Sequence, residues 1–218
     1  MDFSKETFIT FEGTEGCGKS TQIKLLAETL KSRGHDVVLT REPGGCPIAD
    51  KIRAILLDSE SRDMSPATEL LLFAAARAQH FADVIRPALA RGAIVLCDRG
   101  ADSTFAFQVV GRGLPFAMFE AANNIATDGL KPSITFLLDI SLKVGLSRAN
   151  KRNGSDQSEA RFDTEELTFH EKVKAGFNQL AEQEPERFRV IDANQEISAI
   201  AEDILAVLGR GLNKSRPA

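Results

Sequence analysis

A phosphate-binding loop is the clearest chemical signal, because residues 13–20 read GTEGCGKS and fit the spacing G-x-x-x-x-G-K-[ST]. The glycines let the backbone turn so that successive N–H groups converge on phosphate oxygens. Lys19 adds a point charge for the β- and γ-phosphates, and the Ser20 hydroxyl suits Mg²⁺. An apolar segment precedes the loop and a helical pattern follows it, which favours a phosphate site over a plain glycine-rich turn.

The loop by itself leaves motors, GTPase switches, transporter ATPases and kinases open. A GTPase would be expected to carry a guanine-reading Asn-Lys-x-Asp segment, and the sequence has none. Instead, arginines stand in three further segments, at residues 40–45 (TREPGG), 73–80 (FAAARAQH) and 98–99 (DR). Their forked guanidinium donors suit a second phosphate group.

Short apolar runs that alternate with helical patterns supply the elements that hold these residues. We expect five strands, at residues 7–12, 37–40, 93–97, 134–138 and 188–191. We expect helices from about Ser20 to Gly34 and over residues 48–57, and a longer one capped by Ser65 that should kink or break at Pro87. Strands that are apolar on both faces indicate a parallel sheet covered on both sides. The sequence therefore predicts an α/β chain with the three-layer P-loop NTPase fold, a five-stranded parallel sheet with helices on both faces, and ligands beyond the carboxyl ends of the strands.

Residues 151–160 (KRNGSDQSEA), called the lid segment below, are polar and too short to link two domains. We therefore expect a single domain over residues 1–218. The segment is open to two interpretations, a mobile lid over a site or a solvated loop, and its composition favours neither.

Composition narrows the classes of partner. Lys and Arg number 27 against 31 Asp and Glu, a net charge of −4, so no broad basic surface is expected to hold nucleic acid. No window approaches the roughly 18 consecutive apolar residues of a membrane span, and the first residues start a strand instead of a signal peptide, so we expect a cytoplasmic protein without membrane association. Three cysteines, without metal-ligand spacing, favour neither disulfides nor zinc.

Taken together and in register, these segments resemble the thymidylate kinase family over nearly the full chain. The resemblance extends to residues 103–108 (STFAFQ), 111–113 (GRG) and 169–173 (FHEKV). It implies ATP-dependent phosphorylation of dTMP to dTDP with Mg²⁺, by a homodimer. Another P-loop nucleoside monophosphate kinase or a deoxynucleoside kinase is the alternative enzyme, and a regulatory P-loop switch is the alternative outside enzymes.

For the base, the resemblance implies that Phe73 stacks on the thymine ring and that Arg77 hydrogen-bonds its O4. Thr104 and Gln108 occupy positions of further base contacts, and the Phe107 ring blocks a ribose 2′-hydroxyl. An aromatic face with donors at the edge of the ring is what base recognition needs. Taken alone, Phe73 would be interpreted as a core residue, and Arg77 or Arg99 as a surface or ion-paired residue.

For the acceptor phosphate and sugar, the resemblance implies that Arg53 and Arg99 hold the phosphate. Glu42 and Pro43 shape the turn against it, and Glu15 lies near the sugar 3′-hydroxyl. A deoxynucleoside kinase, whose acceptor is an uncharged hydroxyl, would not need the two arginines.

On the donor side, the loop and the residue after it are expected to bind ATP. This set consists of Gly13, Thr14, Glu15, Gly16, Cys17, Gly18, Lys19, Ser20 and Thr21. By resemblance, residues 191–195 lie where the adenine rests. Asp98, at the end of a strand, is expected to reach Mg²⁺ together with Ser20, although a strand-end Asp can also simply cap the next turn.

Transferring a phosphoryl group requires positioning and neutralisation of charge, and we expect Lys19, Arg99 and Glu15 to contribute to it. The chain resembles the bacterial type of the family, which has Glu in the loop and basic residues around the lid segment. Those here are Arg148, Arg152 and Arg161, of which Arg152 is our candidate for the catalytic arginine. Two positions depart from the common family pattern: Gly100 replaces Tyr or His, and Phe107 replaces Tyr.

Overall fold

A computed structural model describes residues 7–153, 161–162 and 165–213. Its centre is one sheet in the order β2-β3-β1-β4-β5, with every neighbouring pair parallel. The strands are β1 (Phe8–Glu12), β2 (Val37–Arg41), β3 (Ile94–Asp98), β4 (Ile134–Asp139) and β5 (Phe188–Asp192). The five predicted strands and their parallel arrangement are confirmed.

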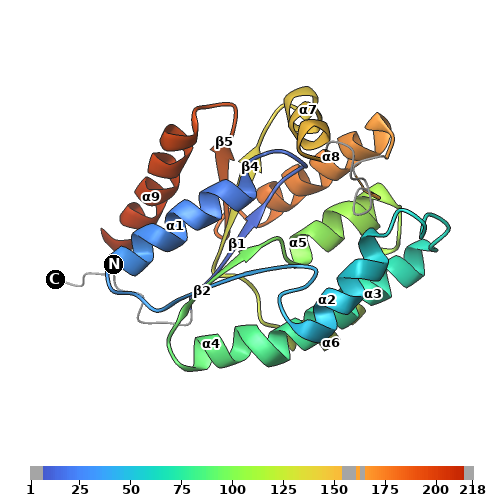
Figure 1. The fold of residues 1–218 in the computed structure, drawn as a ribbon, viewed down its shortest axis with the longest axis horizontal. Helices are drawn as coiled ribbons and strands as arrows, with labels where there is room; N and C mark the ends of the chain where they lie inside the picture. Colours follow the sequence, from blue (N-terminus) through green and yellow to red (C-terminus); the bar gives the residue numbers. More distant parts are fainter. Residues whose placement is uncertain (1–6, 154–160, 163–164, 214–218) are drawn as a thin grey trace.

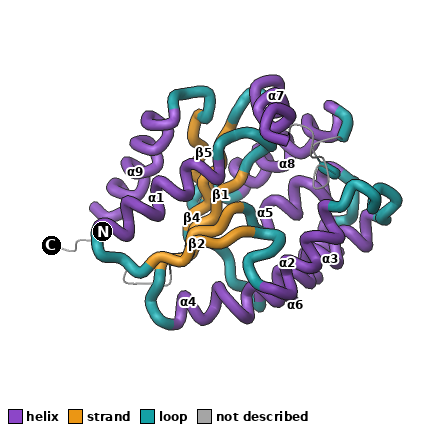
Figure 2. The backbone as a smooth tube through the Cα atoms, viewed as in Figure 1, coloured by secondary structure: helices purple, strands orange, loops and turns teal. Residues whose placement is uncertain are grey.

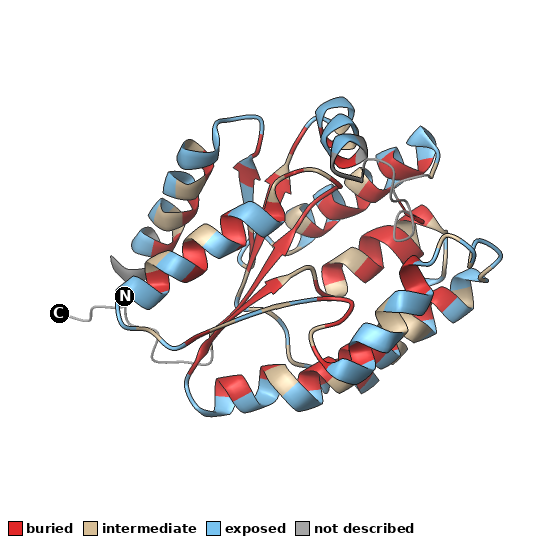
Figure 3. Ribbon diagram, viewed as in Figure 1, coloured by how far each residue is buried: buried red, intermediate tan, exposed pale blue. Residues whose placement is uncertain are grey.

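Helices cover both faces of this sheet, as expected for strands with buried residues in succession (Figure 1). In chain order they are α1 (Lys19–Ser32), α2 (Pro47–Leu57), α3 (Pro66–His80), η1 (Phe81–Ile85), α4 (Arg86–Ala90), α5 (Ala101–Thr104), η2 (Phe105–Gly111), α6 (Phe116–Thr127), α7 (Leu142–Asn153), α8 (Leu167–Gln183) and α9 (Ile197–Asn213), where η marks a π-helix. Figure 2 shows the strands enclosed between these helices, and Figure 3 shows that the central strands are almost wholly buried.

Alternate residues of the strands pack into separate cores on the two faces of the sheet. Ile9 and Phe11 of β1 pack with Phe136 of β4 under α1 and α9. On the opposite face, Phe8 joins a core with η1 and α4, while Leu137 joins another with η2 and α8. The backbone of a strand points successive side chains to opposite faces, so the sheet is fixed from both sides.

Of the kink or break expected at Pro87, the long helix shows no break. Its N-cap is as predicted, with Ser65 Oγ accepting from the Thr68 N–H at 3.2 Å, but the helical path continues through η1 and α4 to Ala90. The Arg86 N–H bonds the carbonyl of Phe81, five residues back. This wider π turn changes the hydrogen-bond register just before a residue that has no N–H to donate.

Within the described ranges, none of the helices combines the length and apolar character that a membrane span requires. The lid segment lies largely outside the described residues, and α8 begins at Leu167.

Candidate active site

A cavity of about 1040 Å³ opens beyond the carboxyl ends of β1, β2 and β3, where the fold predicts ligands. Most of the residues singled out from the sequence line it: Glu15, Gly16, Cys17, Gly18, Lys19, Ser20, Thr21, Glu42, Pro43, Arg53, Phe73, Arg77, Asp98, Arg99, Thr104, Phe107 and Gln108. Gly13 and Thr14 lie behind this lining, in the same loop. One continuous space therefore joins the phosphate loop to the arginine-bearing segments.

The phosphate loop between β1 and α1 is folded tightly around Lys19. The Nζ of Lys19 donates to the carbonyl oxygens of Gly13, at 3.1 Å, and Thr14, at 3.0 Å. Gly16 has a φ of 68° and rests against α7, so that a Cβ there would collide with the carbonyl oxygen of Gly145. The loop needs glycine at this position for both reasons.

The two residues expected to hold a metal lie together at the mouth of the loop. Ser20 Oγ donates to Asp98 Oδ2 at 2.7 Å. A hydroxyl and a carboxylate facing a phosphate-binding loop are the oxygen ligands that Mg²⁺ takes beside nucleotide phosphates. The pair fits a magnesium ion.

Arg99 connects the phosphate loop to the start of α5, and its backbone has the left-handed φ of 69°. Its Nη2 donates to Glu15 Oε1 at 2.8 Å, and its Nη1 donates to Gly13 O at 3.1 Å and Ser103 Oγ at 2.9 Å. Burial opposes its charge, but Glu15 and its acidic neighbours more than offset this and raise the pKa of Arg99. Two expected catalytic residues, Arg99 and Glu15, are thus in direct contact.

His170 of α8 lies next to Glu15. It belongs to residues 169–173, one of the segments that resemble the family, but the resemblance assigned it no role. Its Nδ1 lies 3.8 Å from Glu15 Oε2, and both of its ring nitrogens and that carboxylate oxygen are buried without a hydrogen-bond partner among the described residues. Glu15 Oε2 can therefore accept a further hydrogen bond, either from His170 after a small movement of its ring or from a water molecule.

Arg77 is held by a buried polar chain that begins in β2. Its Nε donates to Glu42 Oε2 at 2.7 Å, and its Nη2 donates to Thr104 Oγ1 at 2.8 Å. Glu42 Oε1 faces His80 Nδ1 at 3.2 Å, and His80 Nε2 lies 2.6 Å from Thr40 Oγ1. Burial works against ionised Glu42, but Arg77 and His80 outweigh it and lower the pKa of this carboxyl. The sequence signalled no role for His80 beyond its place in the quoted segment.

Phe73, Phe107 and Phe162 form an apolar wall of the cavity. Phe162 approaches both Phe73 and Phe107, with ring centroids 6.1 Å and 5.6 Å apart. The Arg99 guanidinium lies 5.3 Å from the centre of the Phe107 ring. The wall suits a flat ring, and Phe162 is a member of it that sequence reasoning missed.

Gln108 is held from behind by a buried acid, Glu69 of α3. Its Nε2 donates to Glu69 Oε1 at 2.8 Å. Arg112 Nε approaches the same oxygen at 3.2 Å, and Arg161 Nη1 lies 2.6 Å from Glu69 Oε2. One feature of the sequence could have indicated that Glu69 lies at the site. It precedes Phe73 and Arg77 by four and eight positions, so all three share a helix face.

The arginines around the lid segment have different environments. Arg148 is exposed and lines the cavity, whereas Arg161 is buried against Glu69 and does not line it. The side chain of Arg152, our candidate for the catalytic arginine, lies outside the described part of the chain. Arg53 lines the cavity and donates to Pro43 O at 3.0 Å.

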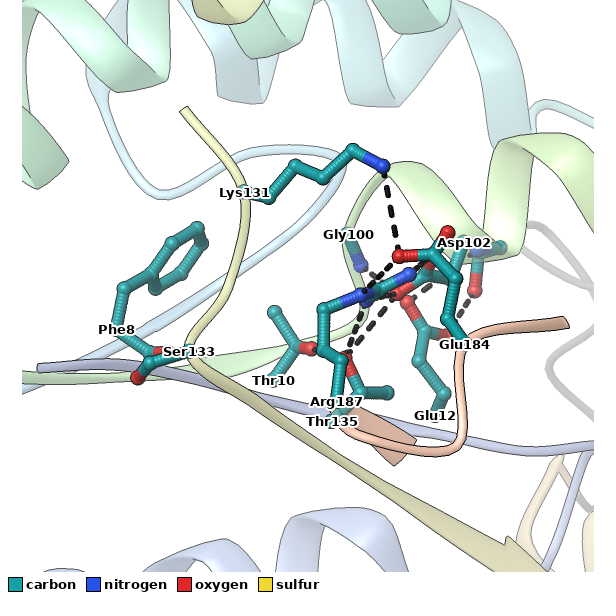
Figure 4. A network of polar contacts seen from close by, with 11 residues as sticks. Phe8, Thr10, Glu12, Gly100, Asp102, Lys131, Ser133, Thr135, Glu184 and Arg187 are labelled. Carbon is teal, nitrogen blue, oxygen red and sulfur yellow. Dashed lines mark hydrogen bonds and ion pairs between the residues drawn. The ribbon is translucent and has the colours of Figure 1, made fainter. Parts of the chain in front are cut away.

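Glu12, at the end of β1, fixes the segment that carries Arg99 (Figure 4). Its Oε1 accepts from the N–H of Gly100 at 2.7 Å and of Ser103 at 3.3 Å, and its Oε2 accepts from Ser103 Oγ at 2.5 Å. Burial, with the nearby charge of Asp102, raises the pKa of Glu12 to about 8. The glycine at position 100 also fits tightly, since a Cβ there would come 3.2 Å from the methyl group of Thr10.

Asp102 anchors the same segment to the far strands of the sheet. Arg187 donates to both carboxylate oxygens of Asp102, at 2.6 Å and 2.8 Å, and also to Thr135 Oγ1 at 2.7 Å (Figure 4). Thr135 in turn bonds Thr10 of β1 at 2.8 Å. Glu184 holds Arg187 from the solvent side, at 2.9 Å.

Comparison with known proteins points to one family. A model of the thymidylate kinase family matches residues 11–204. The thymidylate kinase of Geotalea uraniireducens is 56% identical over 210 residues, which covers 94% of this chain and 99% of that protein. The thymidylate kinase of Geobacter sulfurreducens is 56% identical over 203 residues, which covers 92% of this chain and 95% of that protein.

A solved structure shares the fold. The crystal structure of thymidylate kinase from Ehrlichia chaffeensis matches with a TM-score of 0.75 at 33% identity, covering 94% of this chain and 99% of that one. This likeness confirms the P-loop NTPase fold that the sequence predicts.

Proposed function

The chain belongs to the thymidylate kinase family, and on that premise we propose that it transfers the γ-phosphoryl group of ATP to dTMP, forming dTDP. One observation supports this most directly: a single cavity joins a phosphate loop to a second group of arginines and an aromatic wall. A donor triphosphate and an acceptor monophosphate can therefore meet in line without leaving the protein.

On the donor side, ATP occupies the loop from Gly13 to Thr21, whose glycines turn N–H groups toward phosphate oxygens. Lys19 lies along this loop and moves its charge from the loop carbonyls to the β- and γ-phosphates. Ser20 and Asp98 hold a magnesium ion, which neutralises phosphate charge when bound. Asn194 and Gln195 also line the cavity, and the adenine rests against them.

On the acceptor side, Phe73 stacks on the thymine and Phe107 closes the slot beside the sugar. Arg77 donates to the thymine O4. Three of its five N–H groups bond Glu42, Thr104 and Asn123, the last at 3.4 Å. The remaining N–H groups are available to a ligand.

The acceptor phosphate binds Arg53 and Arg99, near the turn at Glu42 and Pro43. Glu15, paired with Arg99, accepts a hydrogen bond from the sugar 3′-hydroxyl. The carboxylate thus orients both the sugar and the arginine.

The chemical step asks for charge neutralisation more than for proton transfer, because the phosphoryl group passes through a loose transition state. Lys19 and Arg99 supply positive charge where the two phosphates meet. Closure of the lid segment over the cavity brings Arg152 to the transferred group. The arginine then contacts charge that is greatest in the transition state.

The active unit is a homodimer in the cytoplasm. The helices α2, α3 and α6 lie side by side (Figure 1) and carry exposed apolar side chains, among them Leu71 at 62% and Ile125 at 84% exposure. A second copy covering this face would remove that apolar surface from water. Light scattering behind size exclusion tests the assembly, with Ile125→Glu expected to shift it to monomers and the wild type to dimers.

The function itself is tested by ADP release in three reactions: ATP with dTMP, ATP with thymidine, and ATP alone. We expect turnover with dTMP only. Turnover with thymidine at a comparable rate would instead indicate a nucleoside kinase. Hydrolysis of ATP independent of both acceptors would indicate a switch or an ATPase.

A further inference from the structure

On the acceptor side of the cavity, α3 is joined by two polar bridges to the helical segment in which η2 directly follows α5. Arg77 bonds Thr104 at one bridge, and Glu69 bonds Gln108 at the other. Phe73 lies between them on α3, since residues 69, 73 and 77 follow one face of the helix. A flat ring stacked on Phe73 therefore has a guanidinium donor toward one bridge and the Gln108 amide toward the other.

The orientation of the Gln108 amide is dictated by Glu69. A carboxylate offers acceptors only, so the amide atom 2.8 Å from Glu69 Oε1 has to be the nitrogen. The guanidinium groups of Arg112 and Arg161 lie against the same carboxylate. The amide oxygen of Gln108 is then the free end; it is buried, and no partner bonds it among the described residues.

We propose that Glu69 determines base specificity by holding Gln108 with its amide oxygen presented as an acceptor in the acceptor cavity. The inference rests on the proposed function. Thymine carries O4, an acceptor, next to N3–H, a donor; Arg77 and the Gln108 oxygen supply the complementary pair. Cytosine carries an amino group and an unprotonated N3 at these places, so both contacts are mismatched. Glu69 touches no substrate atom and is a positioning residue.

Replacing Glu69 with glutamine tests the orientation, because Arg161, whose Nη1 lies 2.6 Å from Glu69 Oε2, will attract the new amide oxygen to that position more strongly than Arg112 Nε, 3.2 Å from Oε1, attracts it to the other. The amide nitrogen of residue 69 then faces Gln108, which turns over and presents N–H₂ to the cavity. This group repels the N3–H of thymine and donates a hydrogen bond to the unprotonated N3 of cytosine. We expect the ratio of kcat/KM for dTMP to that for dCMP to fall by roughly 10–100-fold.

Two comparisons separate this effect from general damage. Uracil has the same O4 and N3–H edge as thymine, so the dTMP-to-dUMP ratio should stay unchanged in Glu69→Gln. The matched control is Glu165→Gln, which removes a charge bonded to Arg112 at 2.6 Å but does not contact Gln108. It should leave both ratios unchanged.

Gln108→Leu provides a second route if Glu69→Gln does not fold by circular dichroism. It removes the acceptor and leaves Glu69 with its arginines, so the dTMP-to-dCMP ratio should again fall by roughly 10-fold or more. The double variant should show no further fall. If either variant, folded, keeps the wild-type ratio, the proposal is overturned. If instead the wild type does not phosphorylate dTMP, it is the proposed function that fails.

Discussion

Glu12→Gln should change how the stability of the protein depends on pH. The neutral acid and glutamine offer the same pattern to their neighbours: one oxygen accepts from the N–H groups of Gly100 and Ser103, and the other atom donates to Ser103 Oγ, which reverses the bond that the carboxylate accepts from this hydroxyl. Ionising Glu12 instead places a negative charge in a buried site near Asp102. The variant therefore mimics the protonated state and cannot take up the unfavourable charge.

The sign and the window follow from the pKa. Glu12 titrates at about 8 in the folded protein against 4.5 ordinarily, so the folded state binds more protons between these values. Stability from this group is complete below pH 4.5 and is lost as the pH rises through 8. The rise in pKa sets a ceiling of about 5 kcal/mol, and rearrangement around a buried charge should reduce the observed loss to about 1–3 kcal/mol.

Urea unfolding at pH 5, 6, 7 and 8, at constant ionic strength, measures this. The wild type should lose stability relative to Glu12→Gln across the series. Glu184→Gln is the control: Arg187 lowers the pKa of this half-exposed carboxyl, so its removal should cost under about 1 kcal/mol and leave the slope from pH 5 to 8 unchanged. Parallel curves for wild type and Glu12→Gln would refute the reasoning.

Three further predictions concern activity. Lys19→Ala should lower kcat by at least about 100-fold with an unchanged circular dichroism spectrum, because the lysine serves phosphates and not the core; activity within tenfold of wild type would contradict the loop's role. Arg77→Ala should reduce the preference for dTMP over dCMP in kcat/KM, and a preserved preference would exclude it as the O4 donor. Arg152→Ala should lower kcat by roughly 10²–10⁴ with little change in the KM for dTMP. In the same assay Arg148→Ala should have a smaller effect, and Arg161→Ala should chiefly lower the melting temperature, since this arginine is buried against an acid; full kcat in all three would refute a catalytic lid segment.

The sheet and the phosphate loop were predictable from sequence because their signals are local. An apolar run marks each strand, and the loop's glycines and lysine occupy fixed positions. The cavity residues Phe73 and Arg77 were predictable only through a resemblance in register, since each alone has the pattern of a core or surface residue. Their places on one face of α3 then follow from helical geometry.

The supporting residues were not predictable, because their meaning depends on partners distant in sequence. Glu69 reads as an ordinary charge near a helix N-terminus until Gln108 and Arg161 are folded against it. Glu12 reads as the polar end of a strand until Gly100 and Ser103 close over it. The course of the helix at Pro87 was missed for another reason: a π turn has no sequence pattern as distinct as that of a proline.

In the π-helix η2 each hydrogen bond spans five residues, one more than in an α-helix. The number of residues in this segment therefore determines which side chains face the cavity. Deleting one residue ahead of Gln108 would restore α-helical geometry and rotate every later side chain by about 100° around the axis. Gln108 would lose Glu69, and Thr104 and Gln108 could no longer serve the slot together. Among relatives, insertions and deletions should therefore be rare across residues 105–111, while the surface loop at residues 58–65 should tolerate them.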